Sequence, residues 1–270
     1  MNKQMIPYEF ERIQFDDGML DSVDVTYIIH LENNGRYEHI MKQLSKYHPT
    51  RIVYILMNKG YKNSVKQPFI TNSSLDLIDA FITVFKHAKN YNHILVLEDD
   101  FIFSDEIIKH RHNVNKTIQQ LDNNFMYVLG CIPFFQIPYN LNHYRVLASI
   151  GTHAIVYSKE YRKTALSTDQ KQIKDWDAYT NQHIHRIVYY LPLCYQVFPD
   201  TDNSKMWCKD KPLLFYYMCI SLRRIFKMLK LDTSPEPGTS FYYVLSKCLP
   251  ILVCILFILL LKKIVRVHKK

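Results

Sequence analysis

Ile94-Leu95-Val96-Leu97-Glu98-Asp99-Asp100 is the stretch of sequence that decides the fold, because four apolar residues run directly into three carboxylates. A short apolar run of this kind predicts a strand that is buried on both faces of a sheet. The acids then lie at the carboxyl end of the strand, where open α/β sheets place their ligand crevices. Three adjacent negative charges there indicate a bound cation, although an acidic loop without a ligand would have the same sequence.

The three carboxylates point in different directions on an extended chain. Residues i and i+2 share one side, so Glu98 and Asp100 can reach the same ion. Carboxylate oxygens are the ligands that hard divalent cations such as Mn2+ and Mg2+ prefer. Asp99 faces away and is expected to support the loop. The sequence therefore predicts a metal site at Glu98 and Asp100.

Strand and helix patterns alternate on both sides of the acids. Strands are expected over 23–31, 51–57 and 125–129, with helices over 37–47, 75–89 and 106–121. Ser73 or Ser74 is the expected N-cap of the second helix. Alternation of this kind predicts an α/β fold with a mainly parallel sheet flanked by helices.

Two features after the fourth expected strand are less regular. Residues 131–139 are rich in proline and aromatic side chains, and we expect a loop that packs against the domain or forms the lip of a binding site. Residues 146–150 and 151–157 are expected to be two short strands that meet at Gly151.

A long apolar segment lies near the C-terminus. Residues 241–261 have the length and composition of a transmembrane helix, with Lys247 near one end able to snorkel; a buried core helix is the alternative. A basic tail follows over 262–270. The N-terminal residues lack the apolar core of a secretory signal, so we expect a single-pass C-terminal anchor with the globular domain in the cytosol.

The distribution of charge favours a membrane as partner and argues against nucleic acid. The net charge is +9, but residues 241–270 contain six basic residues and no acid, so the remainder has 34 − 6 = 28 basic against 25 acidic residues. Most of the excess charge therefore lies beside the apolar segment. Residues 205–240 form a basic amphipathic segment and linker, expected on the membrane surface or packed on the domain. This leaves residues 1–204 as the globular domain.

Several common site types are missing from the sequence. With six glycines it contains neither GxGxxG nor GxxxxGK[ST], which removes support for Rossmann oxidoreductases and P-loop ATPases. Six cysteines without a CxxC pair argue against a disulfide framework and a zinc site.

A second polar cluster contains Asp175, Asp177 and His183. One aspartate is a candidate general base for an acceptor hydroxyl, and His183 is a candidate third metal ligand. The alternatives are that the aspartates cap a helix near Ala178 and that His183 and His185 lie on the surface.

The order of these motifs resembles glycosyltransferase family 25, which includes lipopolysaccharide-type and collagen galactosyltransferase-like enzymes. The matching residues span about 23–204 and are Tyr27-Ile28-Ile29-His30-Leu31, Arg36, Ser74, Leu97-Glu98-Asp99-Asp100, Tyr127-Val128-Leu129-Gly130, Gly151-Thr152-His153-Ala154, Tyr157-Ser158, Asp175 to Asp177, Pro192, Gln196 and Asn203-Ser204. The resemblance implies a GT-A fold, a nucleotide-sugar donor, a manganese-type metal and inversion at the sugar carbon.

The resemblance also implies roles for individual residues. Glu98 and Asp100 take the places of a DxD motif, and Asp175 or Asp177 lies in the acceptor half. The residues expected on the nucleotide side are His30, Glu32, Arg36 and Asp99. The chain departs from the family at His30, where asparagine is usual, and at Leu75, where histidine is usual.

We therefore expect a membrane-anchored, metal-dependent, inverting glycosyltransferase. It would move a hexose from a nucleotide-sugar to a hydroxyl of a glycan, protein or lipid acceptor. The alternative is a transferase-like domain that has lost catalysis and serves as a membrane-bound structural or binding protein. A metal-dependent phosphoesterase would need more clustered ligands than the sequence offers.

Overall fold

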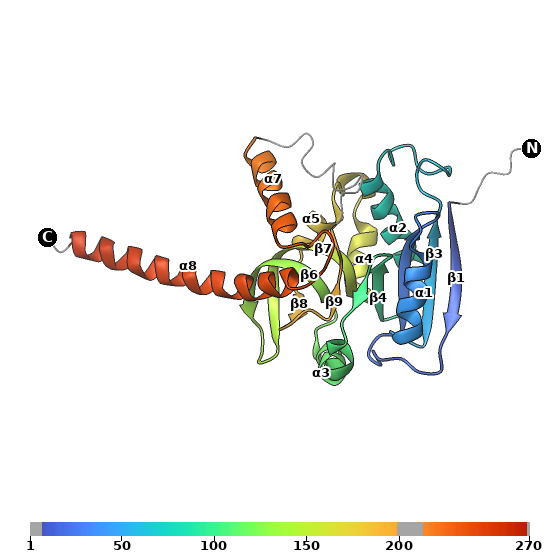
Figure 1. The fold of residues 1–270 in the computed structure, drawn as a ribbon, viewed down its shortest axis with the longest axis horizontal. Helices are drawn as coiled ribbons and strands as arrows, with labels where there is room; N and C mark the ends of the chain where they lie inside the picture. The colour runs from blue at the N-terminus through green and yellow to red at the C-terminus, as the bar shows by residue number, and fades with distance from the viewer. Residues whose placement is uncertain (1–6, 199–212, 269–270) are drawn as a thin grey trace, which may run out of the picture.

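The computed structural model of the chain describes residues 7–198 and 213–268 (Figure 1). The boundary predicted at residue 204, the Asn203-Ser204 pair and the first part of the 205–240 segment lie outside the described residues. The elements are, in chain order, β1 (Tyr8–Gln14), β2 (Val25–Leu31), α1 (Tyr37–Lys46), β3 (Ile52–Asn58), α2 (Ser73–His87), β4 (His93–Glu98), β5 (Ile102–Phe103), α3 (Glu106–Gln120), β6 (Met126–Pro138), β7 (His143–Ser158), α4 (Lys159–Ser167), the 3-10 helix η1 (Gln170–Gln172), α5 (Trp176–Asn181), β8 (Arg186–Tyr189), β9 (Cys194–Tyr195), α7 (Leu213–Met228) and α8 (Gly238–His268).

A seven-stranded sheet in the order β1-β3-β2-β4-β7-β6-β8 forms the centre of the domain. Strands β2, β3 and β4 are mutually parallel, and β6 and β8 run in the same direction because β4 and β6 both pair antiparallel with β7. Only β1 and β7 oppose this direction among the strands of this sheet. The predicted α/β fold with a mainly parallel sheet is confirmed.

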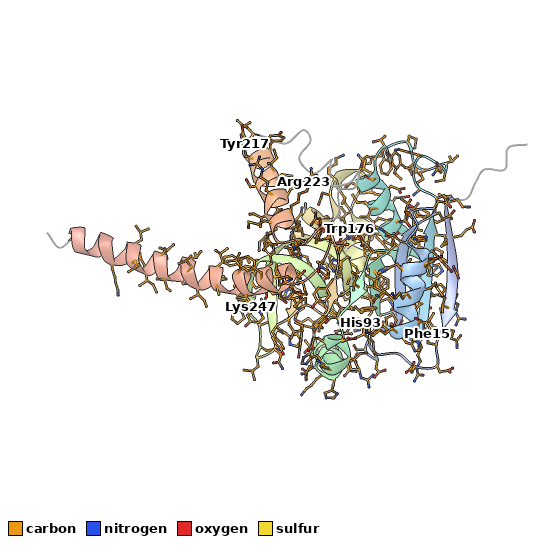
Figure 2. The ribbon with its side chains drawn as sticks, in the orientation of Figure 1. Phe15, His93, Trp176, Tyr217, Arg223 and Lys247 are labelled. Atoms are coloured by element: carbon orange, nitrogen blue, oxygen red, sulfur yellow. The ribbon has the colours of Figure 1, made fainter. Side chains whose placement is uncertain are left out.

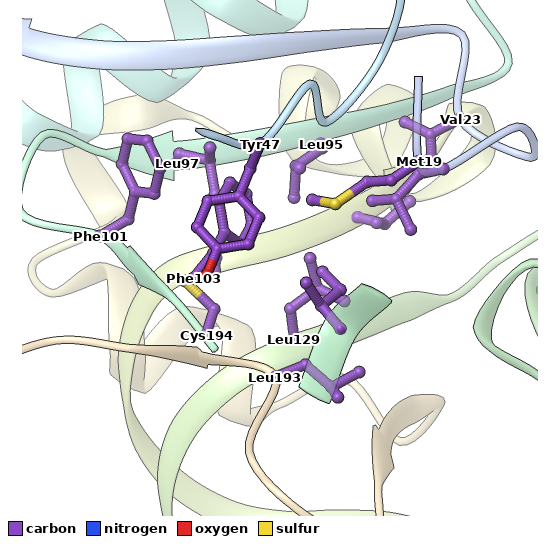
Figure 3. Close-up of a cluster of buried hydrophobic side chains, with 14 of the residues drawn as sticks. Met19, Val23, Tyr47, Leu95, Leu97, Phe101, Phe103, Leu129, Leu193 and Cys194 are labelled. Atoms are coloured by element: carbon purple, nitrogen blue, oxygen red, sulfur yellow. The ribbon is translucent and has the colours of Figure 1, made fainter. Parts of the chain in front are cut away.

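Helices cover both faces of the sheet, so the strands alternate between two cores. On β4, Leu95 and Leu97 face the side covered by α1 and α3, where Figure 3 shows them near Tyr47 and Phe103. Ile94 and Val96 face the opposite side, covered by α2, α4 and α5. Burial on both faces explains why the strand is apolar without alternation.

Strands β6 and β7 differ from the prediction. Residues 131–138 continue β6 and are not a loop, and β7 is one strand that passes through Gly151. The pairing of β6 with β8 ends at Val128, and the β6–β7 register shifts repeatedly between Val128 and Gln136. Prolines are tolerated at irregular or unpaired positions, which is why Pro133 and Pro138 misled the prediction.

Helix α2 begins at Ser73, two residues earlier than the expected start at residue 75. The side chain of Asn72, and not of Ser73 or Ser74, accepts a hydrogen bond of 2.9 Å from the Leu75 amide. Asparagine and serine are equally good N-caps, so composition could not distinguish the positions.

The C-terminal helix begins inside the domain. Tyr243 belongs to the core between the sheet and α2, and Tyr242 packs with Ile132, Phe226 and Leu231. Residues from both sides of the predicted boundary at 204 therefore share one packed interior. Farther along, α8 leaves the domain as an isolated rod (Figure 1), and residues 238–262 are long and apolar enough to cross a membrane.

Two expectations for this region change. The Lys247 ammonium does not snorkel, because it binds the Tyr190 carbonyl at the base of α8 (Figure 2). Cys219 on α7 is disulfide-bonded, whereas the cysteine count had argued against a disulfide framework.

Candidate functional site

A cavity of about 540 Å3 lies at the carboxyl ends of β2, β3 and β4. The beginnings of α2 and α5 and residues 196–198 complete its wall. This is the position predicted for a ligand crevice in an open α/β sheet. The predicted site residues that line it are Arg36, Glu98, Asp99, Asp100, Asp175 and Asp177.

Glu98 ends β4, and its carboxyl group forms no ion pair among the contacts of the described residues. Its Oε1 accepts a hydrogen bond of 2.9 Å from the Thr152 hydroxyl on β7. Burial, followed by the negative charges of Asp100 and Asp177, raises the pKa of Glu98 well above its ordinary value. Three carboxylates that repel one another in one cavity wall favour a bound cation.

Asp100 is held from two sides. Arg36 Nη1 lies 3.1 Å from its Oδ2, and Gln196 Nε2 donates to both carboxylate oxygens at 2.9 and 3.0 Å. Burial raises the pKa of Asp100 in spite of the opposing charge of Arg36. The carboxylate is therefore oriented by neutral and positive donors but remains short of positive charge.

Asp99 holds the loop that carries the other two acids. It accepts hydrogen bonds from the Leu31 amide at 3.1 Å, from Asn34 at 2.6 Å and from Arg36 at 2.7 Å. The buried His30 forms a fourth hydrogen bond to Asp99, from its Nδ1 at 3.1 Å. Burial alone would raise the pKa of Asp99, but the bonds from His30 and Arg36 lower it. The contacts agree with the expected supporting role.

Replacing Asp99 by asparagine should destabilise the protein by about 3–5 kcal/mol, because Arg36 and His30 would face an amide in place of a buried carboxylate. Urea unfolding followed by circular dichroism measures the loss. The exposed Asp122→Asn variant removes an acid from the surface and should change the free energy of unfolding by less than about 0.5 kcal/mol. Equal stability of the two variants would show that Asp99 does not hold the loop.

The two aspartates of the second cluster have separate positions. Asp175 caps α5, because its side chain accepts a hydrogen bond of 2.8 Å from the Ala178 amide. This is the capping role given above as the alternative. Trp176, which lies between them in the sequence and inside the domain (Figure 2), stacks on Phe81 with 4.6 Å between ring centres and fixes the helix to the core. Asp177 Oδ2 accepts a hydrogen bond of 3.2 Å from the Gly151 amide. Burial, and then the charge of Asp175, raises the pKa of Asp177 to about 6.

Three predicted residues are not part of the cavity wall. His183 Nε2 lies 3.3 Å from the Asn124 carbonyl, so the structure does not bring it to Glu98 and Asp100 as the expected third metal ligand. His30 reaches the site only through Asp99. Glu32 follows β2, and its amide bonds the Asn58 carbonyl; its side chain is outside the described lining.

Sequence reasoning gave no role to Thr152 and Gln196, the residues that contact Glu98 and Asp100. Both occur in the motif order quoted for the family resemblance, which was the available signal. Each is a neutral side chain brought to the site by a strand distant in sequence, and no local spacing marks such a contact.

The donor set fits a hard divalent cation in chemistry and charge. Glu98 and Asp100 offer carboxylate oxygens, and Arg36 is the only cationic side chain that pairs with either of them within the described residues. Within residues 7–198 and 213–268, no three His, Cys, Asp or Glu side chains are arranged as ligands of one ion. A cation here would therefore complete its coordination with oxygens from a ligand or from water.

Comparisons with known proteins give a distant likeness in fold only. No family model and no curated protein matches the sequence. Solved structures that match include A197 from STIV, with 11% identity, a TM-score of 0.42, and coverage of 66% of this chain and 87% of that one. A glycosyltransferase involved in the glycosylation of the major capsid of PBCV-1 matches with 13% identity, a TM-score of 0.29, and coverage of 53% and 63%. Likenesses this weak do not identify a reaction, so the functional argument depends on the cavity.

Proposed function

We propose that this protein is a metal-dependent glycosyltransferase that moves a hexose from a nucleotide-sugar to an acceptor hydroxyl with inversion. The observation that carries the proposal is the convergence of Glu98, Asp100 and Asp177 on one cavity at the carboxyl end of a mainly parallel sheet. Two of these acids suit a cation and its diphosphate, and the third suits an acceptor proton.

The donor end of the cavity contains Glu98, Asp100 and Arg36. A divalent cation held by Glu98 and Asp100 would supply positive charge to the leaving diphosphate. Arg36 is a fixed donor beside Asp100, and its own pKa is raised because the charges of Asp100 and Asp99 outweigh burial. It is therefore placed to bind a phosphate oxygen as well.

The acceptor end contains Asp177. Its carboxylate takes the proton of the acceptor hydroxyl as the acceptor oxygen bonds to the anomeric carbon. The bond from that carbon to the diphosphate breaks, and the diphosphate leaves with the electron pair. Attack opposite the leaving group inverts the sugar carbon. The Gly151 amide holds Asp177 in position for this role.

Binding of nucleoside diphosphates tests the donor half of the proposal. Titration calorimetry of the full chain with UDP, GDP and CDP should show heat for one of them in Mn2+ and little heat without metal. The same titration of Asp100→Asn should lose the metal-dependent heat. Absence of heat with every nucleotide in Mn2+ would favour the alternative of a transferase-like domain without a donor site.

The rate should depend on the ionisation of Asp177. Because this carboxyl must be ionised to accept a proton and its pKa is about 6, kcat/KM should rise as the pH increases through about 6 and then level off. Initial rates at constant ionic strength between pH 5 and pH 8 measure this. A kcat/KM that does not change with pH over this range would show that Asp177 is not the general base.

We also propose that the C-terminal helix anchors the protein in a membrane. The apolar residues of α8 beyond the domain are exposed to their surroundings, as a lipid-facing helix requires. The cytosolic orientation predicted from the sequence stays a prediction, and the disulfide at Cys219 weighs against it because such bonds are rare in the cytosol. Protease protection in sealed vesicles distinguishes the two sides.

A further inference from the structure

The first turns of α8 are fixed to the globular domain. Thr239, Tyr242, Tyr243 and Ser246 are buried against it. Lys247 binds the Tyr190 carbonyl, and its ammonium lies 4.8 Å from the centre of the Tyr144 ring. The anchor therefore continues directly from the domain, because α8 is one unbroken helix from its packed turns through Pro250 into the exposed rod (Figure 1).

The opposite face of these turns is apolar and exposed. Phe241, Val244, Leu245 and Leu249 are 50%, 61%, 44% and 37% exposed. Their spacing places them on one side of the helix, together with Cys248, which is also exposed. A helix that rests on a soluble domain normally presents polar residues outward, so this apolar face requires a cover.

The length of α8 indicates what the cover is. From Leu249 to Leu261, where the helix is free of the domain, the rise of about 1.5 Å per residue gives about 18 Å. The hydrocarbon core of a bilayer is about 30 Å thick. The distance from Phe241 to Leu261 is about 30 Å. The helix therefore spans the core only if the outward face of its packed turns also meets lipid.

We infer that the domain is seated directly on the bilayer, with Phe241, Val244 and Leu245 in contact with lipid while the other side of the same turns packs on the protein. Ser240 and Lys262 mark the polar limits of the lipid-facing surface. The inference rests on the proposed membrane anchor and does not depend on the proposed catalysis.

The position of Lys247 supports this arrangement. A charge at this depth is tolerated when it faces protein and pairs with backbone carbonyls. Lys247 does both, since it points away from the apolar face toward Tyr190 and the rings of Tyr144 and Tyr243.

If the domain rests on the bilayer in this way, the cavity has a fixed distance from the membrane and a fixed orientation relative to it. Phe198, which lines the cavity, lies 5.1 Å from Phe226 between ring centres, and Phe226 packs on Tyr242 at the root of α8 at 5.8 Å. The cavity and the packed turns of α8 are therefore parts of one packed body. Such a cavity would reach acceptor groups that lie at a constant distance from the bilayer.

Spin labels on the full-length protein test the inference. Cys248 and Cys254 are replaced by serine, and single labels are placed by Val244→Cys, Ile255→Cys and Glu38→Cys. The label at Val244 tests the packed turns of α8, and the label at Ile255 tests the part of the helix that is free of the domain. The label at the exposed Glu38 on α1 reports on the water-facing surface. The protein is reconstituted in phosphatidylcholine vesicles, and relaxation by oxygen is compared with relaxation by a water-soluble nickel chelate.

The Val244 and Ile255 labels should both collide with oxygen more than with nickel, and the Glu38 label should show the reverse. If Val244 resembles Glu38 while Ile255 stays in lipid, the domain is tethered and not seated. If Val244 is shielded from both reagents and broadened by a second label, another copy covers the face. If Ile255 also meets nickel, the anchor itself is absent. Each of the last three results overturns the inference.

Discussion

Replacing Asp100 by asparagine should lower sugar transfer by about 10³-fold or more while the protein stays folded. Asp100 offers one of the two carboxylates proposed to hold the cation. A neutral amide would bind a divalent cation much less tightly, so the positive charge that would balance the leaving diphosphate would be lost. Its partners Arg36 and Gln196 can still bond to the amide, so the loop should keep its position. Initial rates with saturating Mn2+ measure the loss, and circular dichroism confirms the fold.

The matched control is Asp122→Asn, which makes the same substitution at an exposed site outside the cavity lining. It should retain the activity of the unmodified protein. Full activity of Asp100→Asn in the presence of metal would remove the proposed cation site, even if transfer itself were real.

Replacing Asp177 by asparagine should lower kcat by about 10²- to 10⁴-fold, the usual contribution of a general base. The amide oxygen can still accept the hydrogen bond from the Gly151 amide, so the change removes the proton acceptor with little disturbance. Binding of the nucleoside diphosphate should persist, because Asp177 lies at the acceptor end. Single-turnover rates and calorimetry separate the two effects.

Asp175→Asn is the matched variant for this test. Asparagine also caps helices well, so the bond to the Ala178 amide remains while the charge is lost. Its effect on kcat should be much smaller than that of Asp177→Asn. A larger loss at Asp175 than at Asp177 would exchange the roles of the two residues.

The first half of the sheet was predictable because its information is local. On β4 the apolar run and the acids that follow it identify both the strand and its end, and the βαβ order then brings β2 and β3 alongside. The β6–β7 pair was not predictable in the same way. Pro133 and Gly151 are turn signals in isolation, and only the pairing between the two long strands makes them strand residues.

The candidate site divides along the same line. Glu98, Asp100 and Arg36 come together because they follow the ends of neighbouring strands, which strand order alone predicts. The metal-ligand role of His183 is predicted from residue type alone, without a helix or strand that positions it. In the structure His183 follows α5 and contacts the Asn124 carbonyl instead. Gln196 reaches Asp100 from a segment distant in sequence, so only the folded chain shows the contact.

The C-terminal helix shows how two alternatives can both hold in part. The composition of 241–261 predicts a membrane span, and the exposed rod agrees with it. The first turns of the same helix are nevertheless core, with Tyr243 among the buried residues of the domain. Hydropathy averages over the helix faces, so it could not separate the side of Tyr243 from the side of Val244.

The most direct test of the proposed transferase is a turnover screen. The full chain, and not residues 1–204, is required because Tyr243 belongs to the core. Release of nucleoside diphosphate from a panel of nucleotide-hexoses is measured in Mn2+, with and without simple sugar acceptors, beside Asp100→Asn. We predict release from at least one donor by the unmodified protein and none above background by the variant. Equal release by both proteins, or none from any donor, would contradict the proposed function.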